Sequence, residues 1–160
     1  MPRIKLDAID IKILNLLQED ASVSNIDLAE LVGLSQSPCL RRVRALEEAG
    51  IISKRVTLID ARAVDLAVNV FVSVTLEKQI KERLQDFEGE IKRRPEVLEC
   101  YLMTGEADYL LRIMVPDLQS YERFLKDHLT RITGIASIKS SFALSQVQYR
   151  TALPLNHIRI

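Results

Sequence analysis

Residues 24–50, SNIDLAELVGLSQSPCLRRVRALEEAG, constrain the fold of this chain most, because their capping signals leave room for only two short helices. Ser24 and Asp27 have the S-x-x-D spacing of a capping box at a helix start. Gly33 stands where a short helix ends in a left-handed residue. Ser35 is placed to cap the next helix, which therefore begins almost at once. The segment is typical of a helix-turn-helix.

The second of these helices has a basic outer face. A projection at about 100° per residue separates an apolar side from a polar side that carries the arginines. We expect Arg41 to read base edges, since a guanidinium pairs bidentately with guanine, and Arg42 on the flank to contact phosphate. The alternative is that these arginines form the solvated face of an ordinary amphipathic helix. The predicted DNA-contacting residues are Gln36, Ser37, Pro38, Arg41, Arg42, Arg44, Lys54 and Arg55.

Two flanking segments complete this unit. Apolar residues at helical spacing predict a supporting helix from about Asp7 to Glu19, with Asp7 as its N-cap. The alternating segment from Ile52 to Leu58 carries Lys54 and Arg55 and resembles one strand of a wing, although an ordinary linker strand would have the same pattern. Residues 1–60 are therefore predicted to be a winged helix-turn-helix domain, followed by a linker at 61–66.

The charge balance limits what kind of nucleic-acid binder this chain can be. With 22 basic and 22 acidic residues, it is not a general polyanion binder, so any DNA contact must be local. A modest basic patch also predicts that affinity comes from pairing several copies on repeated half-sites.

Other site chemistry is sparse. Cys39 and Cys100 lack the spacing of a disulfide framework or a metal site, and His128 and His157 are isolated from ligand partners. The longest uncharged stretch, residues 66–76, is shorter than the roughly 20 residues that span a bilayer. We expect a soluble, cytoplasmic protein with no metal, no cofactor and no membrane partner.

The second half of the chain changes to a different pattern. Alternation at residues 68–76 predicts a strand, apolar residues at 80–91 a helix, and two apolar runs at 97–103 and 109–115 a hairpin. A helix capped by Asp117 and a final strand from Ile135 to Tyr149 follow. The order βαββαβ predicts a ferredoxin-like domain over residues 67–160, so the whole chain is of the α+β class.

The hairpin strands are apolar on both faces, whereas two helices can cover only one face of the sheet. An uncovered apolar face would be a large exposed patch. We therefore expect a second copy to pack against it, giving a dimer with two DNA-binding units.

Three segments resemble the Lrp/AsnC family of bacterial and archaeal transcriptional regulators, and most of all its leucine-responsive branch. They are the opening helix from Leu6 to Leu17, the segment VGLSQSPCLRRVRALEEAGI at 32–51 and the hairpin TGEADYLL at 104–111. The resemblance implies dimers that gather into tetramers or octamers, and an amino-acid effector bound near the hairpin turn. It also implies a nucleoid-associated protein. Carried over, the effector-binding residues are Tyr101, Met103, Thr104, Gly105 and Asp108.

The local chemistry is compatible with that site. Gly105 allows close backbone approach, and Asp108 could pair with an ammonium group. The alternative is that both residues only shape the turn. Two other functions are open: a siroheme-decarboxylase-like enzyme of the same two-domain architecture, and an architectural DNA-binding protein without an effector. We expect a non-enzymatic regulator whose assembly and DNA binding respond to a small amino acid.

Overall fold

The computed structural model describes residues 5–158, which divide into two compact units. The first unit contains residues up to 58 together with the tail from 148 onward, and the second contains residues 59–147. The sequence pattern had placed the tail in the second domain. Its contacts instead group it with the first.

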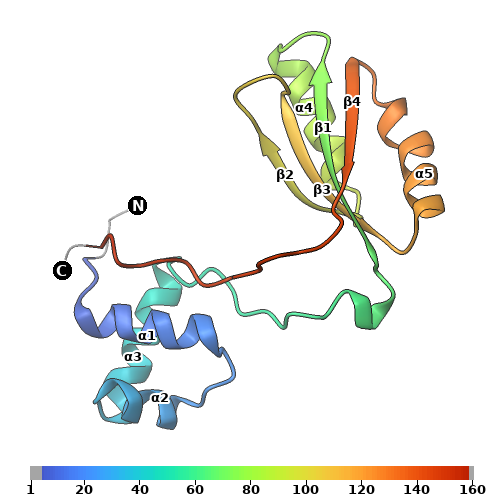
Figure 1. Cartoon of the computed structure of the whole chain (residues 1–160). Helices are drawn as coiled ribbons and strands as arrows, with labels where there is room; N and C mark the ends of the chain where they lie inside the picture. Colours follow the sequence, from blue (N-terminus) through green and yellow to red (C-terminus); the bar gives the residue numbers. More distant parts are fainter. Residues whose placement is uncertain (1–4, 159–160) are drawn as a thin grey trace. The chain divides into compact units, whose positions relative to one another are not determined.

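The first unit is built on three helices, α1 (Ala8–Glu19), α2 (Asn25–Val32) and α3 (Gln36–Glu48) (Figure 1). Two of the predicted N-caps are confirmed, because Asp7 forms a capping box with Asp10 and the Ser24 side chain accepts a hydrogen bond from the Asp27 N–H, whereas the Ser35 side chain makes no capping bond. Gly33 ends α2 with a left-handed φ of 78°. Apolar residues from all three helices form one buried core: Ile13, Leu14, Leu28, Ala29, Val32, Cys39, Val43 and Leu46.

The segment after α3 differs from its prediction. Residues 53–60 form no helix or strand, so the expected strand of a wing is absent from the described part of the chain. Only Ile52 is partly buried against the core, while Val56 and Leu58 are exposed. The alternating pattern therefore marks an extended segment that has no neighbouring strand to pair with.

The tail returns to the first unit and is held at α1. The Gln18 side chain accepts a hydrogen bond from the Leu153 N–H at 2.7 Å and donates one to the Leu153 carbonyl at 3.3 Å. Leu155 packs against the helical core. The final strand is consequently shorter than predicted, because the chain leaves the sheet after Phe142 and does not continue as a strand to Tyr149.

The second unit has the predicted βαββαβ order: β1 (Val68–Leu76), α4 (Lys81–Lys92), β2 (Val97–Leu102), β3 (Tyr109–Val115), α5 (Leu118–Asp127) and β4 (Ile135–Phe142). Short 3-10 turns precede β1 at Arg62–Val64 and follow α5 at Leu129–Arg131. The strands form one antiparallel sheet in the order β2-β3-β1-β4, as expected of a ferredoxin-like domain.

Both helices of the second unit cover the same face of this sheet (Figure 1). Alternate residues of β1 and β3, from Val70 to Leu76 and from Tyr109 to Val115, are buried under Phe87, Ile91, Tyr121 and Phe124. The residues between them point to the other face, which neither helix of the second unit covers.

Candidate nucleic-acid interface and ligand hollow

Helix α3 presents a basic face to solvent, as its projection predicted. Cys39, Val43 and Leu46 are buried in the core of the first unit, and Arg41 and Arg44 are exposed on the opposite side. Arginine forks on an open helix face have the geometry needed to reach base edges in the major groove. Leu40, which the projection assigned to the apolar side, is 38% exposed.

The start of α3 is also accessible. Gln36 and Ser37 are exposed, and Pro38 is half-buried in the first turn. Asn25 at the start of α2 donates a hydrogen bond to the Gln36 carbonyl at 3.0 Å, which fixes the turn between the two helices. The Ser35 side chain makes no capping bond, so the first N–H groups of α3 are left for other acceptors.

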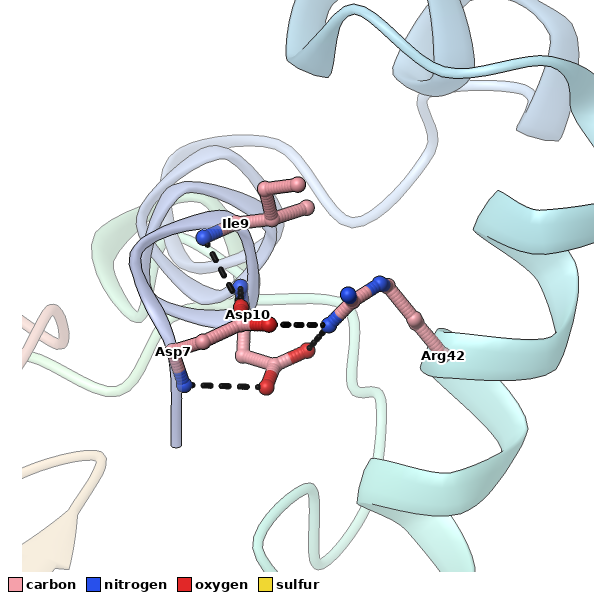
Figure 2. Close-up of polar contacts among 4 residues, drawn as sticks. All are labelled: Asp7, Ile9, Asp10 and Arg42. Carbon is pink, nitrogen blue, oxygen red and sulfur yellow. Dashed lines mark hydrogen bonds and ion pairs between the residues drawn. The ribbon is translucent and has the colours of Figure 1, made fainter. Parts of the chain in front are cut away.

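Arg42 faces α1 rather than solvent, as Figure 2 shows. One guanidinium nitrogen, Nη1, lies 2.8 Å from Asp7 Oδ2 and 2.8 Å from Asp10 Oδ1. Hydrogen bonds from Asp10 and Arg42 hold the pKa of the Asp7 carboxyl below its usual value. These carboxylates raise the pKa of Arg42. The residue predicted to contact phosphate therefore joins the recognition helix to its supporting helix.

The two basic residues after α3 differ in their surroundings. Arg55 pairs with Glu47 of α3 at 3.0 Å, and both side chains are more than 40% exposed. Lys54 is exposed and forms no ion pair within the described residues. An exposed ion pair of this kind is weak, so Arg55 can exchange Glu47 for another anion.

The uncovered face of the sheet is mixed rather than apolar. Phe71, Tyr101 and Met103 are exposed on or beside it. Between them Arg112 bridges strands, with its Nη1 2.7 Å from Glu99 Oε1. This hydrogen bond lowers the pKa of Glu99. The expectation of apolar residues on both faces of the hairpin is thus only partly met.

A small hollow lies on this face beside the hairpin turn, with a volume of about 320 Å³. We call it the sheet-face hollow; its lining is Ser73, Thr75, Met103, Thr104, Glu106, Ala107, Tyr109, Leu110, Ser137 and Lys139. Its size is near the lower end of small-molecule sites. Two of the predicted effector-binding residues, Met103 and Thr104, are part of it.

The strand register explains how this lining comes together. Ser73 of β1 is paired with Leu110 on one side and Lys139 on the other, and directly paired residues point to the same face. Glu106 and Lys139 are both exposed and form no ion pair within residues 5–158. Sequence reasoning named neither residue. Lys139 could not be found from a local pattern, because the pairing of β4 with β1 joins segments far apart in the chain, whereas Glu106 lies between the predicted Gly105 and Asp108 in the same turn.

Asp108 lies below the turn and is only 6% exposed. Its Oδ2 accepts a hydrogen bond from the Leu76 N–H at 2.7 Å, and its Oδ1 accepts one from the Gln79 side chain at 2.5 Å. The carboxylate thus joins the hairpin turn to the segment after β1.

The other two predicted residues lie near the hollow without lining it. Gly105 occupies the turn with a φ of 132°, a conformation that favours glycine. Tyr101 of β2 is paired with Leu110 of β3, so its side chain points to the same face of the sheet as Leu110, which lines the hollow. Its hydroxyl donates a hydrogen bond to Glu99 at 2.8 Å.

Among residues 5–158, no group of three or more His, Cys, Asp and Glu side chains is placed to hold a metal ion. Within the same residues, no helix is both long and apolar enough to cross a membrane.

Two families match consecutive parts of the chain. Residues 6–53 match a winged helix-turn-helix DNA-binding family, and residues 69–153 match the Lrp/AsnC ligand binding domain.

Individual relatives match nearly the whole chain. The Bkd operon transcriptional regulator of Pseudomonas aeruginosa is 50% identical, over 94% of this chain and 99% of its own length. The leucine-responsive regulatory protein of Salmonella typhimurium is 36% identical, over 95% of this chain and 93% of its own length. A transcriptional regulator from Neisseria meningitidis, solved in complex with L-Met, is 40% identical with a TM-score of 0.92, covering 96% of this chain and 99% of that structure.

Proposed function

Because the chain belongs to the Lrp/AsnC family of transcriptional regulators, we propose that it binds operator DNA through α3 and a small amino acid through the sheet-face hollow. For the DNA side, the supporting observation is the open face of α3, where Arg41 and Arg44 are exposed together. Lys54 is accessible beyond the end of the helix and supplies a contact to the DNA backbone.

For the effector side, the observation that carries the proposal is the pair of unpartnered charges at the hollow. Lys139 offers an ammonium to a ligand carboxylate, and Glu106 offers a carboxylate to a ligand ammonium. A free α-amino acid carries both charges on one carbon atom, so a hollow with one site of each sign suits it.

The remaining lining favours an apolar side chain on that ligand. Met103 and Leu110 supply apolar surface, and the Ser73 and Ser137 hydroxyls supply further hydrogen-bonding groups. We therefore propose an amino acid such as L-Met or L-Leu. The Neisseria meningitidis relative was solved with L-Met, and the Salmonella typhimurium relative is named as leucine-responsive, which supports the same class.

In this proposal Asp108 positions the site. Its carboxylate already holds the Leu76 N–H and Gln79, so the residue fixes the turn that carries Thr104 and Glu106. The ligand ammonium pairs with Glu106 instead, which is exposed beside the hollow.

We also propose that a second copy packs on the uncovered sheet face. That face bears exposed Phe71 and Tyr101, and the hollow opens onto it, so a partner would close over a bound ligand. Ligand binding would then change how dimers gather into larger assemblies, and assembly would determine how many half-sites are held at once.

The protein would act by binding alone, in the cytoplasm and without a cofactor. Its relatives are named as transcriptional regulators. An enzyme of the siroheme-decarboxylase type would instead bind a tetrapyrrole and shift the absorbance spectrum of an added porphyrin. We expect that a porphyrin added to the purified protein keeps its spectrum unchanged.

A thermal-shift screen of the twenty amino acids tests the effector site. We expect an apolar amino acid to raise the Tm of the wild-type protein, and Lys139→Gln and Glu106→Gln to reduce this shift by most of its size. Lys126→Gln is the matched control, because Lys126 is exposed on α5 and pairs with Glu122 outside the hollow. A shift that persists in both hollow variants would refute this site.

A further inference from the structure

A second hollow in the same domain has a different chemistry. It lies between α4 and the end of α5, on the helix side of the sheet, with a volume of about 590 Å³. Four arginines line it, Arg83, Arg93, Arg94 and Arg131, against three carboxylates, Asp86, Glu90 and Asp127. We call it the arginine hollow. It shares no lining residue with the sheet-face hollow.

Most of the carboxylate charge is already engaged. Glu90 contacts two arginines, with Arg93 Nη1 at 2.9 Å and Arg94 Nη2 at 3.4 Å. Asp127 lies 3.2 Å from Arg131 Nη2. Each of these three guanidinium groups has five N–H donors and spends one nitrogen on its carboxylate, so many donors are still available to an oxyanion.

Of the four arginines that line the arginine hollow, Arg83 is the one that forms no ion pair with a carboxylate of the described residues. Its stem passes Gly134, with its Cδ 3.4 Å from the position that a Cβ atom would take on that glycine. Gly134 has a φ of 92° and ends the turn before β4. The Arg83 stem therefore lies against the backbone of the turn at Gly134, which keeps its guanidinium at the hollow.

Gly89 is a second feature of the arginine hollow that favours a bound ligand. It lies inside α4, where glycine lowers helix stability relative to alanine, and it lines the arginine hollow. A Cβ atom built at Gly89 would meet no other atom within 4 Å, so packing inside the protein does not require glycine here. Because Gly89 has no side chain, the backbone of α4 is open at this position and a ligand can lie close to it.

From these features we propose that the arginine hollow binds a small multivalent oxyanion of the phosphate class, such as a phosphorylated metabolite. Arginine forks match the oxygen pairs of phosphate groups, and several guanidinium groups around one cavity favour more than one negative charge. A concave site of this volume suits a free small molecule better than the backbone of a DNA duplex. The proposal is independent of the amino-acid site.

Isothermal titration of the full-length protein with inorganic pyrophosphate at 150 mM NaCl tests this site. We expect saturable binding with one site per chain, weakened at least tenfold in Arg83→Gln. Arg123→Gln is the matched control, since Arg123 is an exposed arginine of α5 outside the arginine hollow and should change the Kd less than twofold.

Gly89→Leu separates binding from folding. Leucine favours helix and meets open space, so the variant should keep or raise its Tm by roughly 3 °C while losing pyrophosphate binding more than tenfold. Equal affinities for wild type, Arg83→Gln and Gly89→Leu would overturn the proposal. A wild-type protein that does not bind pyrophosphate would also overturn the proposal. If Arg83→Gln then weakened binding to duplex DNA, this surface would be a DNA contact.

Discussion

Arg41 and Arg42 are adjacent on α3, and among the described residues Arg42 has carboxylate partners whereas Arg41 has none. The buried side of α3 is occupied by apolar residues, so Arg42 at its margin meets α1, while Arg41 has open solvent around it. A substitution at each position should therefore have a different kind of effect on DNA binding.

Arg41→Ala should weaken binding to a specific operator by about 5- to 150-fold and leave random duplexes nearly unaffected, because a bidentate base contact discriminates between sequences. The measurement is fluorescence anisotropy with an operator that the protein itself selects from random duplexes. Lys54→Ala should weaken both DNAs and reduce the salt slope by about one. Equal loss on both DNAs for Arg41→Ala would make Arg41 a phosphate contact.

Asp108→Ala should destabilise the second unit. The substitution leaves the Leu76 N–H without its acceptor at a buried position, and a lost buried partner costs about 1–3 kcal/mol. Urea unfolding followed by circular dichroism measures the difference. Asp108→Asn retains one carbonyl acceptor and should lose less. If Asp108→Ala unfolded like the wild type and only lost amino-acid binding, Asp108 would be a direct ligand contact.

At the scale of elements, the helix ends and the four sheet strands, except for the end of β4, can be read from the sequence because their signals are local. Asp7, Ser24 and Gly33 act within a few residues of the helix ends that they define. The position of Lys139 beside Ser73 depends on the register of β4 against β1, and no local pattern encodes it. The Arg42 contacts with α1 depend likewise on how two helices pack.

Arg42→Ala should lower the Tm of the first unit by about 3–6 °C, because the variant loses both contacts with α1 and leaves the buried Asp10 carboxylate without its counter-ion, with the Asp7 N–H as its remaining partner. Specific and random DNA should be bound more weakly by the same factor, since α3 would be less firmly held. Differential scanning calorimetry and the anisotropy assay measure the two effects. A variant of unchanged Tm with reduced DNA affinity would return Arg42 to the role of a phosphate contact.

The Asp7 carboxylate, which accepts the Asp10 N–H and pairs with Arg42, predicts a dependence on pH. The folded-state pKa of Asp7 is depressed below the ordinary value of 3.8, so its contribution to stability is present above that value. The contribution is lost as the pH falls through the lower, folded-state pKa. Between pH 5 and pH 3, Asp7→Asn should therefore lose less stability than the wild type in urea titrations. Parallel curves for the two proteins would contradict this.

At the scale of the whole molecule, the chain forms the first unit from both of its ends. It leaves this unit near Leu58, forms the sheet and returns with the tail that Gln18 holds. The βαββαβ order can be predicted from changes in the spacing of apolar residues, but the return of the tail to the first unit cannot. The tail carries no helix or strand signal, and its place is set by the contacts of Leu153 and Leu155.

The most direct test of the account is sedimentation velocity of the full-length protein with and without the amino acid that gives the largest thermal shift. We predict that this amino acid changes the sedimentation coefficient of the wild type and of Lys126→Gln, and leaves that of Lys139→Gln unchanged at the same concentration. A Lys139→Gln protein that changes its assembly as the wild type does, or a wild type whose assembly no amino acid alters, would contradict it.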